Sequence, residues 1–341
     1  MRIAIIASPV TPLRPQQSGG AQAFVSDLAG GLARRGHDVS LHCAEGSEVP
    51  GVQLVMVPAP FDADAALVMP GGRAPEPAPG VAAALEAMFR SIDARTDAVS
   101  QHAFDAPAFE LAIGLPVLHT IHLPPLVPAV VRAVSPIEPT RLATVSKSCR
   151  AAWQKAGVEI EHVLRNGVPD QLVDGAPVEA VALVAGRFSP EKGIEHALQA
   201  AQSAGIRVWV AGAAYDPAYM VDLAGAEQLG SLPRDELRRV MGRSAVTICA
   251  VRWDEPFGLV AAEAQTAGCP VAGYRRGALP EVVEDGVSGL LVEPDNIEAL
   301  ASAIRRCLAL DRRAVRSSAL RRLGIEQALD AYELALKEAA R

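Results

Sequence analysis

One stretch of the sequence constrains the fold most: an apolar run at residues 245–251 is followed by a short loop and a helix-forming segment. The apolar run predicts a buried strand. From Gly258 to Gly268 the residues are good helix formers, so the stretch predicts a strand–loop–helix unit of a parallel α/β sheet. The unpaired N–H groups and the dipole at such a helix start favour a bound anion.

Two glutamates belong to this stretch. Glu255 is in the loop, and Glu263 is about two turns into the helix. The amides of Phe257, Gly258 and Leu259 are predicted among the free donors, and Gly258 lets an anion approach the backbone. A phosphate beside two carboxylates that accept hydroxyl hydrogens indicates a sugar nucleotide. The alternative is one glutamate favoured by the helix dipole and one that is solvated.

The longer string resembles a known family signature. Glu-Pro-Phe-Gly, then Glu263, then Ala-x-x-Ala-Gly-x-Pro-Val is similar to the signature of family 4 retaining glycosyltransferases, which have the GT-B fold. The resemblance implies two Rossmann-like, doubly wound domains facing across a cleft, with a C-terminal helix that crosses back. We therefore predict an acceptor-binding domain at 1–168, a donor-binding domain at 169–323 and the crossing helix at 324–341.

A second motif follows the predicted strand at residues 181–185. It reads Gly-Arg187-Phe-Ser-Pro-Glu-Lys192-Gly. Ser189 is a natural N-cap and Pro190 fits the first helical position, which predicts a helix to about Ala204. Arg187 and Lys192 are two cations at the carboxyl end of a strand, as a diphosphate clamp requires. The string resembles the family motif whose Arg and Lys neutralise the donor diphosphate, and a purely surface role is the alternative.

The first domain opens with a predicted strand at residues 3–7 and a loop that ends in Gly19 and Gly20. A helix is predicted at 21–35. The glycine pair could meet a phosphate at the helix start, or it could be an ordinary turn. In the resembling family, a glycine-rich loop here faces the donor diphosphate. The absence of G-x-G-x-x-G argues against a dinucleotide site.

Two predicted strands of this domain end in histidine. His102 resembles the family residue that faces the sugar, and His122 is a second candidate. Both fall at the carboxyl edge, where α/β sheets bind ligands. A structural role is the alternative for each. Thr120 is a further candidate on the acceptor or sugar side. Because strand residues alternate, we expect one of His119 and Thr120 to lie in the core.

The segment at residues 229–240 resembles the strand and helix beside the nucleotide base, which makes Leu232 a donor-site candidate. Base recognition there is largely by backbone, so the base is not specified by sequence. The loop at residues 276–281 reads Arg-Gly-Ala-Leu-Pro-Glu where relatives commonly show Gly-Gly-x-Pro-Glu. This departure lies near the donor sugar and leaves the sugar unidentified.

Composition narrows the function classes. The net charge of −7 does not favour nucleic acid as a partner. The five cysteines are scattered and have no metal-type spacing. Asp62-Ala-Asp64 looks like the D-x-D motif of other glycosyltransferases, but family 4 does not use it, so we predict no metal and no cofactor. The sequence shows neither a signal peptide nor a membrane span, which predicts a cytoplasmic protein with no indicated membrane association.

The resemblance implies metal-independent transfer of a sugar, with retention, from a nucleotide-diphosphate donor to a hydroxyl of a saccharide or small molecule. UDP is favoured and GDP remains open. The implied catalytic residues are His102, Arg187, Lys192 and Glu255. Alternatives are a nucleotide-sugar epimerase or phosphorylase of similar fold, a non-catalytic nucleotide-sugar-binding protein, and an NAD-dependent enzyme. Ala, Gly, Arg and Pro abundance suggests a bacterial source of high GC content, and oligomeric state stays open.

Overall fold

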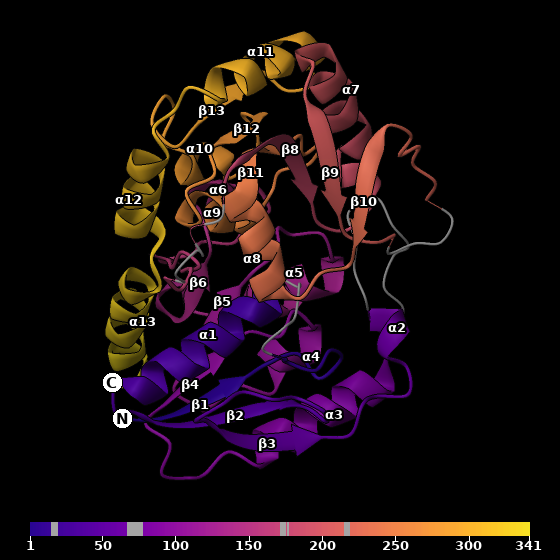
Figure 1. Cartoon of the computed structure of the whole chain (residues 1–341). Coiled ribbons are helices and arrows are strands. Elements are labelled where there is room, and N and C mark those ends of the chain that lie inside the picture. Colours follow the sequence, from indigo (N-terminus) through magenta and orange to yellow (C-terminus); the bar gives the residue numbers. More distant parts are fainter. Residues whose placement is uncertain (15–19, 67–77, 171–174, 176, 215–218) are drawn as a thin grey trace. The chain divides into compact units, whose positions relative to one another are not determined.

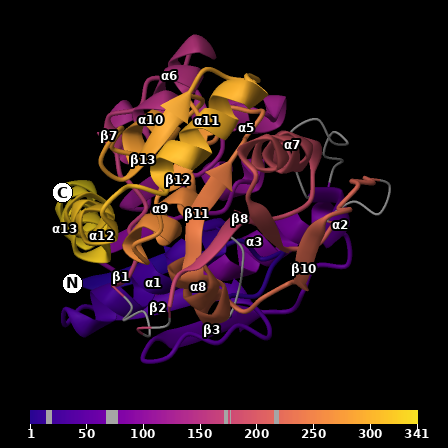
Figure 2. The same cartoon turned by 45° about the horizontal axis from the view of Figure 1, so that its top comes forward.

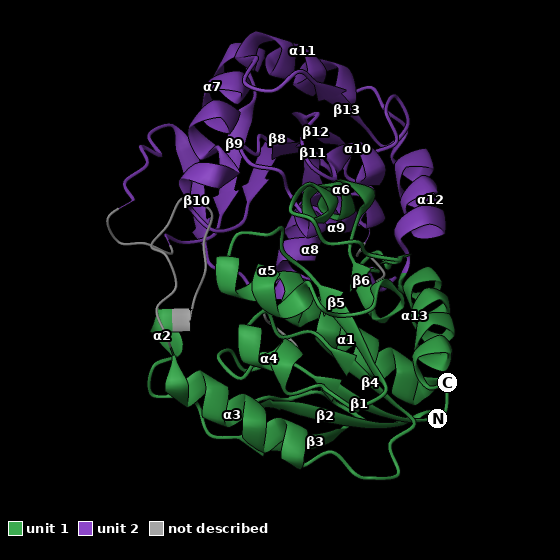
Figure 3. Ribbon diagram, turned by 180° about the vertical axis from the view of Figure 1, so that it is seen from behind, with its two compact units in different colours: residues 1–167, 325–341 green, residues 168–324 purple. Residues whose placement is uncertain are grey.

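The computed structural model describes residues 1–14, 20–66, 78–170, 175, 177–214 and 219–341 (Figure 1). The chain divides into two compact units (Figure 3). Unit 1 comprises Met1–Gly167 and Ile325–Arg341, and unit 2 comprises Val168–Gly324. These bounds lie within one residue of the ranges predicted from the sequence. Among the described residues, no helix is both long and apolar enough to cross a membrane.

Within its described residues, unit 1 contains a parallel seven-stranded sheet of order β3-β2-β1-β4-β5-β6-β7. The strands are β1 (Arg2–Ile6), β2 (Asp38–Ala44), β3 (Gln53–Val57), β4 (Ala98–Gln101), β5 (Val117–Ile121), β6 (Leu142–Thr144) and β7 (His162–Val163). The helices are α1 (Gly20–Arg34), α2 (Ala63–Ala66), α3 (Pro79–Arg90), α4 (Ala106–Glu110), α5 (Pro128–Val134), the 3-10 helix Pro139–Arg141, α6 (Lys147–Lys155) and α13 (Ile325–Ala339).

The sheet of unit 1 is covered on both faces. Side chains of β1 alternate, so Ile3 and Ile5 join the core beneath α1 and α13, while Ala4 and Ile6 join the core beneath α3. Strands buried on both faces read as continuous apolar runs, which is why β1 was recognisable in the sequence. Asp62 has a structural role here, because its carboxylate accepts the amides of Gly80 and Val81 in the first turn of α3.

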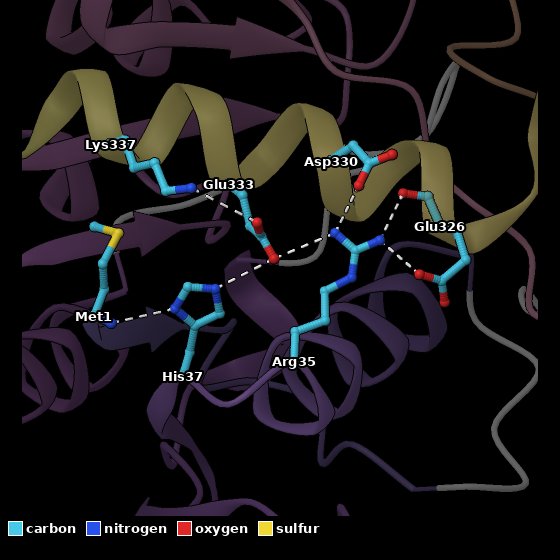
Figure 4. A network of polar contacts seen from close by, with 7 residues as sticks. All are labelled: Met1, Arg35, His37, Glu326, Asp330, Glu333 and Lys337. Atoms are coloured by element: carbon cyan, nitrogen blue, oxygen red, sulfur yellow. Dashed lines mark hydrogen bonds and ion pairs between the residues drawn. The ribbon is translucent and has the colours of Figure 1, made fainter.

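The last helix, α13, belongs to unit 1 although its sequence follows unit 2. Tyr332 and Leu336 are buried against the α1 side of the core. Outside that core, Arg35 donates to Glu326 at 2.5 Å and to Asp330 at 2.8 Å (Figure 4). Glu333 lies 3.2 Å from both Arg35 and His37 in the same network. Apolar packing and ion pairs therefore both hold the C-terminal helix against α1.

In the described part of unit 2, six parallel strands form a sheet of order β10-β9-β8-β11-β12-β13. The strands are β8 (Glu179–Ala185), β9 (Arg207–Ala211), β10 (Ala226–Gly230), β11 (Ser244–Cys249), β12 (Val271–Tyr274) and β13 (Gly289–Val292). The helices are the 3-10 helix Pro190–Lys192, α7 (Ile194–Ala204), α8 (Arg234–Arg243), α9 (Leu259–Thr266), α10 (Leu279–Val282), α11 (Ile297–Cys307) and α12 (Arg312–Leu323).

Both sheets are doubly wound, and each has one point where the strand order reverses. In unit 1 the reversal falls between β1 and β4, because the chain builds outward to β3 on one side and to β7 on the other. In unit 2 it falls between β8 and β11, which pair directly (Figure 2). Open α/β sheets bind ligands at the carboxyl ends of the strands beside such a reversal. We therefore expect the ligand-binding residues in the loops after β1, β4, β8 and β11.

Candidate functional site

The reversal point of unit 2 brings together the two motifs that the sequence singled out. Lys192 is in the loop after β8, and Glu255 is in the loop after β11. The Lys192 ammonium donates to Glu255 Oε2 at 2.8 Å. The indole N–H of Trp253 donates to the same oxygen, also at 2.8 Å. The Lys192 ammonium lies 5.5 Å from the centre of the Trp253 ring, so the three side chains form one cluster.

The backbone around Glu255 is fixed by its neighbours. Its carbonyl accepts the Ala278 amide at 2.8 Å, which ties this loop to the one after β12. Gly277 has φ +58°, and a Cβ there would lie 2.3 Å from the Glu255 nitrogen. The loop at residues 276–281, which departs from the family pattern, therefore packs directly on the Glu255 backbone and requires glycine at this position.

Helix α9 begins just beyond this cluster. Gly258 has φ +92° and occupies the N-cap position, and within the described residues no side chain caps the helix. Phe257 is buried, whereas Leu259 is partly exposed. The uncapped first turn leaves backbone N–H groups at the carboxyl edge of the sheet, where the helix dipole favours an anion.

Arg187 is exposed, and its guanidinium lies 3.6 Å from Glu191 Oε1. Ser189 occupies the predicted N-cap position and Pro190 the first helical position, but the helix that they begin is a 3-10 helix. The Ser189 hydroxyl donates to Glu191 at 2.6 Å instead of capping a helix. The predicted helix end near Ala204 is confirmed by α7, whereas the 3-10 helix at Pro190–Lys192 is separated from α7 by Gly193. Gly193 has φ +61°, and a Cβ there would lie 2.0 Å from the Ala250 carbonyl, so close approach to the β11 loop breaks the helix.

Glu263 lies on α9 and is 5% exposed. Its Oε1 accepts from Arg234 Nε at 2.7 Å and from Arg238 Nη2 at 3.0 Å. Both arginines come from α8 and are themselves 7% and 5% exposed. The predicted donor residue Glu263 is thus part of a buried ion-pair cluster. Leu232, in the loop between β10 and α8, is half-buried two residues before Arg234.

The reversal point of unit 1 lies between the loops after β1 and β4. Gly20 is exposed and begins α1. Gly19 lies outside the described residues. His102 directly follows β4 and His122 directly follows β5. The two histidines therefore lie at the carboxyl ends of neighbouring strands, as their sequence positions predicted.

These histidines are bonded to each other. His102 Nδ1 lies 2.9 Å from His122 Nε2, and His102 Nε2 lies 2.9 Å from the Ser100 hydroxyl. The ring of Tyr332 stacks on His102 with centroids 6.0 Å apart. Each histidine is 7% exposed. Burial lowers the pKa of His102 well below its usual value and lowers the pKa of His122 to about 4, so both rings are neutral near pH 7.

Thr120 and His119 point to opposite faces of β5, as alternation predicts. Thr120 is 1% exposed and accepts a hydrogen bond from the Tyr332 hydroxyl at 3.3 Å. His119 is buried against Phe109 and bonds to Gln101 at 3.2 Å. The expectation that only one of this pair is core is therefore wrong. Thr120 is buried in the core of unit 1, where it contacts α13 through Tyr332.

Sequence reasoning missed several residues of these clusters. Trp253 stands two positions before Glu255, but nothing local indicated that its indole would bind that carboxylate. Arg234 and Arg238 have the i, i+4 spacing of one helix face, which was a readable signal for a shared partner. The contacts of Ser100 and Tyr332 with His102 depend on the strand pairing and on the packing of α13 in unit 1, which local sequence does not show.

Comparison with solved structures defines the class of this fold. AviGT4, a glycosyltransferase involved in avilamycin A biosynthesis, matches with a TM-score of 0.74 and 25% identity, over 99% of this chain and 98% of that one. HepE of Anabaena in complex with UDP matches with a TM-score of 0.74 and 18% identity, over 99% of this chain and all of that one. The protein has the GT-B fold of glycosyltransferases.

Two family profiles then cover the two halves of the chain. The profile for glycosyltransferase family 4 matches residues 18–172, and the profile for glycosyl transferases group 1 matches residues 176–322. The chain belongs to glycosyltransferase family 4.

Curated relatives match over a shorter stretch. The D-inositol 3-phosphate glycosyltransferase of Mycobacterium marinum is 40% identical over 142 residues, which are 38% of this chain and 30% of that protein. The protein of the same name from Mycolicibacterium gilvum is 36% identical over 148 residues, which are 40% of this chain and 33% of that protein. The match thus spans about a third of the length of these relatives.

Proposed function

We propose that this protein is a retaining glycosyltransferase that moves a sugar from a nucleotide-diphosphate donor to an acceptor hydroxyl without a metal ion. The observation that supports this most is the convergence of Lys192 and Glu255 at the reversal point of unit 2, 2.8 Å apart beside the uncapped start of α9. The Lys192 ammonium and the start of α9 suit the diphosphate of a nucleotide sugar, and the Glu255 carboxylate suits the hydroxyl groups of its sugar.

On this proposal, Arg187 and Lys192 offset the charge that builds on the leaving diphosphate. Preorganised charges of this kind are commonly the largest contribution to catalysis. The amides of Phe257, Gly258 and Leu259 add uncharged donors to the same phosphates or to the sugar. Two cations and a helix start supply the positive charge for which other enzymes use a metal ion.

Glu255 binds sugar hydroxyls on this proposal, and Glu263 binds the ribose diol. Only one oxygen of Glu263 is available for the ribose on this proposal, because both arginines donate to Oε1. A ribose hydroxyl would meet the other oxygen. Leu232 would lie beside the base. HepE, of the same fold, was crystallised with UDP-glucose, so UDP and UDP-glucose are the first donor probes to use, followed by GDP-sugars.

Unit 1 binds the acceptor on this proposal. Gly19 and Gly20 approach phosphate, and His102 and His122 contact a sugar from the ends of β4 and β5. Relatives named D-inositol 3-phosphate glycosyltransferase make D-inositol 3-phosphate the first acceptor to test. A saccharide or another small hydroxyl compound is the next class.

The test combines nucleotide release with product analysis. The protein is incubated with UDP-glucose and acceptor, and released UDP and the anomeric configuration of the product are measured, the latter by NMR. The proposal predicts acceptor-dependent UDP release, a product with the donor's anomeric configuration, and no loss of rate in EDTA. An inverted product would contradict retention. Sugar interconversion without transfer would favour an epimerase, and tight binding without turnover would favour a binding protein.

A further inference from the structure

The cluster at Glu255 contains a side chain that the reaction scheme does not use. Trp253 is half-buried, and its indole N–H donates to Glu255 Oε2 at 2.8 Å. Lys192 donates to that same oxygen at 2.8 Å. Within the described chain, Glu255 Oε1 receives no hydrogen bond. The carboxylate is therefore held by one of its oxygens and presents the other.

The two hydrogen-bond donors to Oε2 differ in charge, and this difference matters when the nucleotide sugar binds. Lys192 is the cation proposed to meet the diphosphate, whose charge competes with that of Glu255 for the ammonium. An indole N–H is neutral and has one donor, so a phosphate competes for it far less. If Lys192 turned to the phosphates, Trp253 would be the contact that still holds Glu255.

We propose that Trp253 is a positioning residue for the donor sugar: its indole N–H fixes Glu255 Oε2, so that Oε1 meets a sugar hydroxyl while Lys192 binds the diphosphate. This inference rests on the proposed function. It makes one distinction that the proposed function alone does not make. Trp253 acts on the sugar through Glu255. Its loss therefore lowers the affinity for a nucleotide sugar and leaves the affinity for the nucleoside diphosphate alone unchanged.

The direct test is Trp253→Phe, which keeps an aromatic ring beside Lys192 and removes the N–H. Affinities for UDP and UDP-glucose are measured by calorimetry, or for GDP and GDP-mannose if the unmodified protein binds those. A hydrogen bond to a charged group is strong enough to change an equilibrium about tenfold or more. We expect UDP-glucose binding and kcat/KM to fall about tenfold, and UDP affinity to stay within about twofold.

Unit 2 offers a matched control. The indole N–H of Trp209 donates to Glu227 at 2.9 Å, and Arg243, which pairs with Glu179, lies 5.5 Å from its ring, so Trp209 has the same kind of indole–carboxylate bond and nearby cation as Trp253. Trp209 lies within β9, and its indole bonds to Glu227 of β10, not to a residue of the loops after β8 and β11. Trp209→Phe should change neither UDP nor UDP-glucose affinity. A melting curve of each variant checks that unit 2 remains folded.

A double-mutant cycle tests whether Trp253 acts through Glu255. In a Glu255→Ala background, Trp253→Phe should have no further effect, because the group that it positions is gone. A further loss in that background would overturn the inference, as would equal weakening of UDP and UDP-glucose by Trp253→Phe alone. Unchanged UDP-glucose affinity in Trp253→Phe would also overturn the inference about Trp253, while the proposed function would stand. A wild-type protein that binds no nucleoside diphosphate would overturn both.

Discussion

The buried cluster of Glu263 with Arg234 and Arg238 allows a quantitative prediction about stability. All three side chains are 5–7% exposed, and both contacts to Glu263 are 2.7–3.0 Å long. Glu263→Ala removes the carboxylate and leaves two guanidinium groups inside unit 2. Removing one partner of a buried ion pair costs about 3–5 kcal/mol, because the remaining charge stays desolvated. For a unit of this size, that loss lowers the melting temperature by roughly 6–20 °C.

The matched control is Glu179, which also meets two arginines but at the surface. Arg243 contacts it closely and Arg207 lies 3.9 Å away, with side chains 43% and 68% exposed. Exposed pairs contribute about 0–1 kcal/mol, so Glu179→Ala should lower the melting temperature by only a few degrees.

The assay is thermal unfolding of both variants at one pH and salt concentration, with no nucleotide present. A Glu263→Ala variant that melts no lower than Glu179→Ala would show that the buried arginines do not destabilise unit 2 when Glu263 is lost.

Three further predictions follow from other parts of the molecule. Arg35→Ala should destabilise unit 1 by about 1–2 kcal/mol, since three partly exposed ion pairs are lost, and amide exchange in α13 should rise; unchanged exchange would contradict this. Four buried histidines of unit 1 have pKa values lowered by burial from the unfolded value of about 6.5: His42, His102, His119 and His122. The unfolded chain therefore binds more protons than the folded one as the pH falls through 6.5, and unit 1 should lose up to about 1.4 kcal/mol per histidine per pH unit until the folded pKa is reached, which is about 4 for His42 and His122. A melting temperature as high at pH 5 as at pH 7 would count against this prediction. Gly277→Ala should displace Glu255 and lower sugar transfer roughly a hundredfold, whereas Gly286→Ala, with φ +80° and open space around it, should not; equal activity of the two would exclude the steric explanation.

The strands could largely be predicted from the sequence, for a physical reason. Parallel strands are buried on both faces, so β1 and β11 appear as continuous apolar runs. Helix interruptions were harder. The break at Gly193 is set by the carbonyl of Ala250, which is 57 positions away in sequence and beyond the reach of local propensity. Local signals therefore predict elements, whereas close approach between loops decides where they end.

The candidate site could be predicted in part. The sequence identified Lys192 and Glu255 as site residues, and the pairing of β8 with β11 brings them together across 63 positions. The sequence could not predict that Trp253 donates to the same Glu255 oxygen as Lys192, because side-chain direction in an irregular loop has no periodicity. His102 and His122 were singled out one by one as candidates, and only the adjacency of β4 and β5 shows that they are hydrogen-bond partners.

Direct binding of nucleotides tests whether the cations at the reversal point of unit 2 hold a diphosphate without a metal ion. We would measure the thermal shift caused by UDP, GDP, ADP, TDP and NAD, with and without magnesium, in the wild-type protein and in Arg187→Ala. Selective binding to the folded state raises the melting temperature by mass action. We expect a nucleoside diphosphate to raise the melting temperature independently of magnesium, and we expect Arg187→Ala to abolish this shift. A shift with NAD alone, or with no nucleotide, would contradict this expectation.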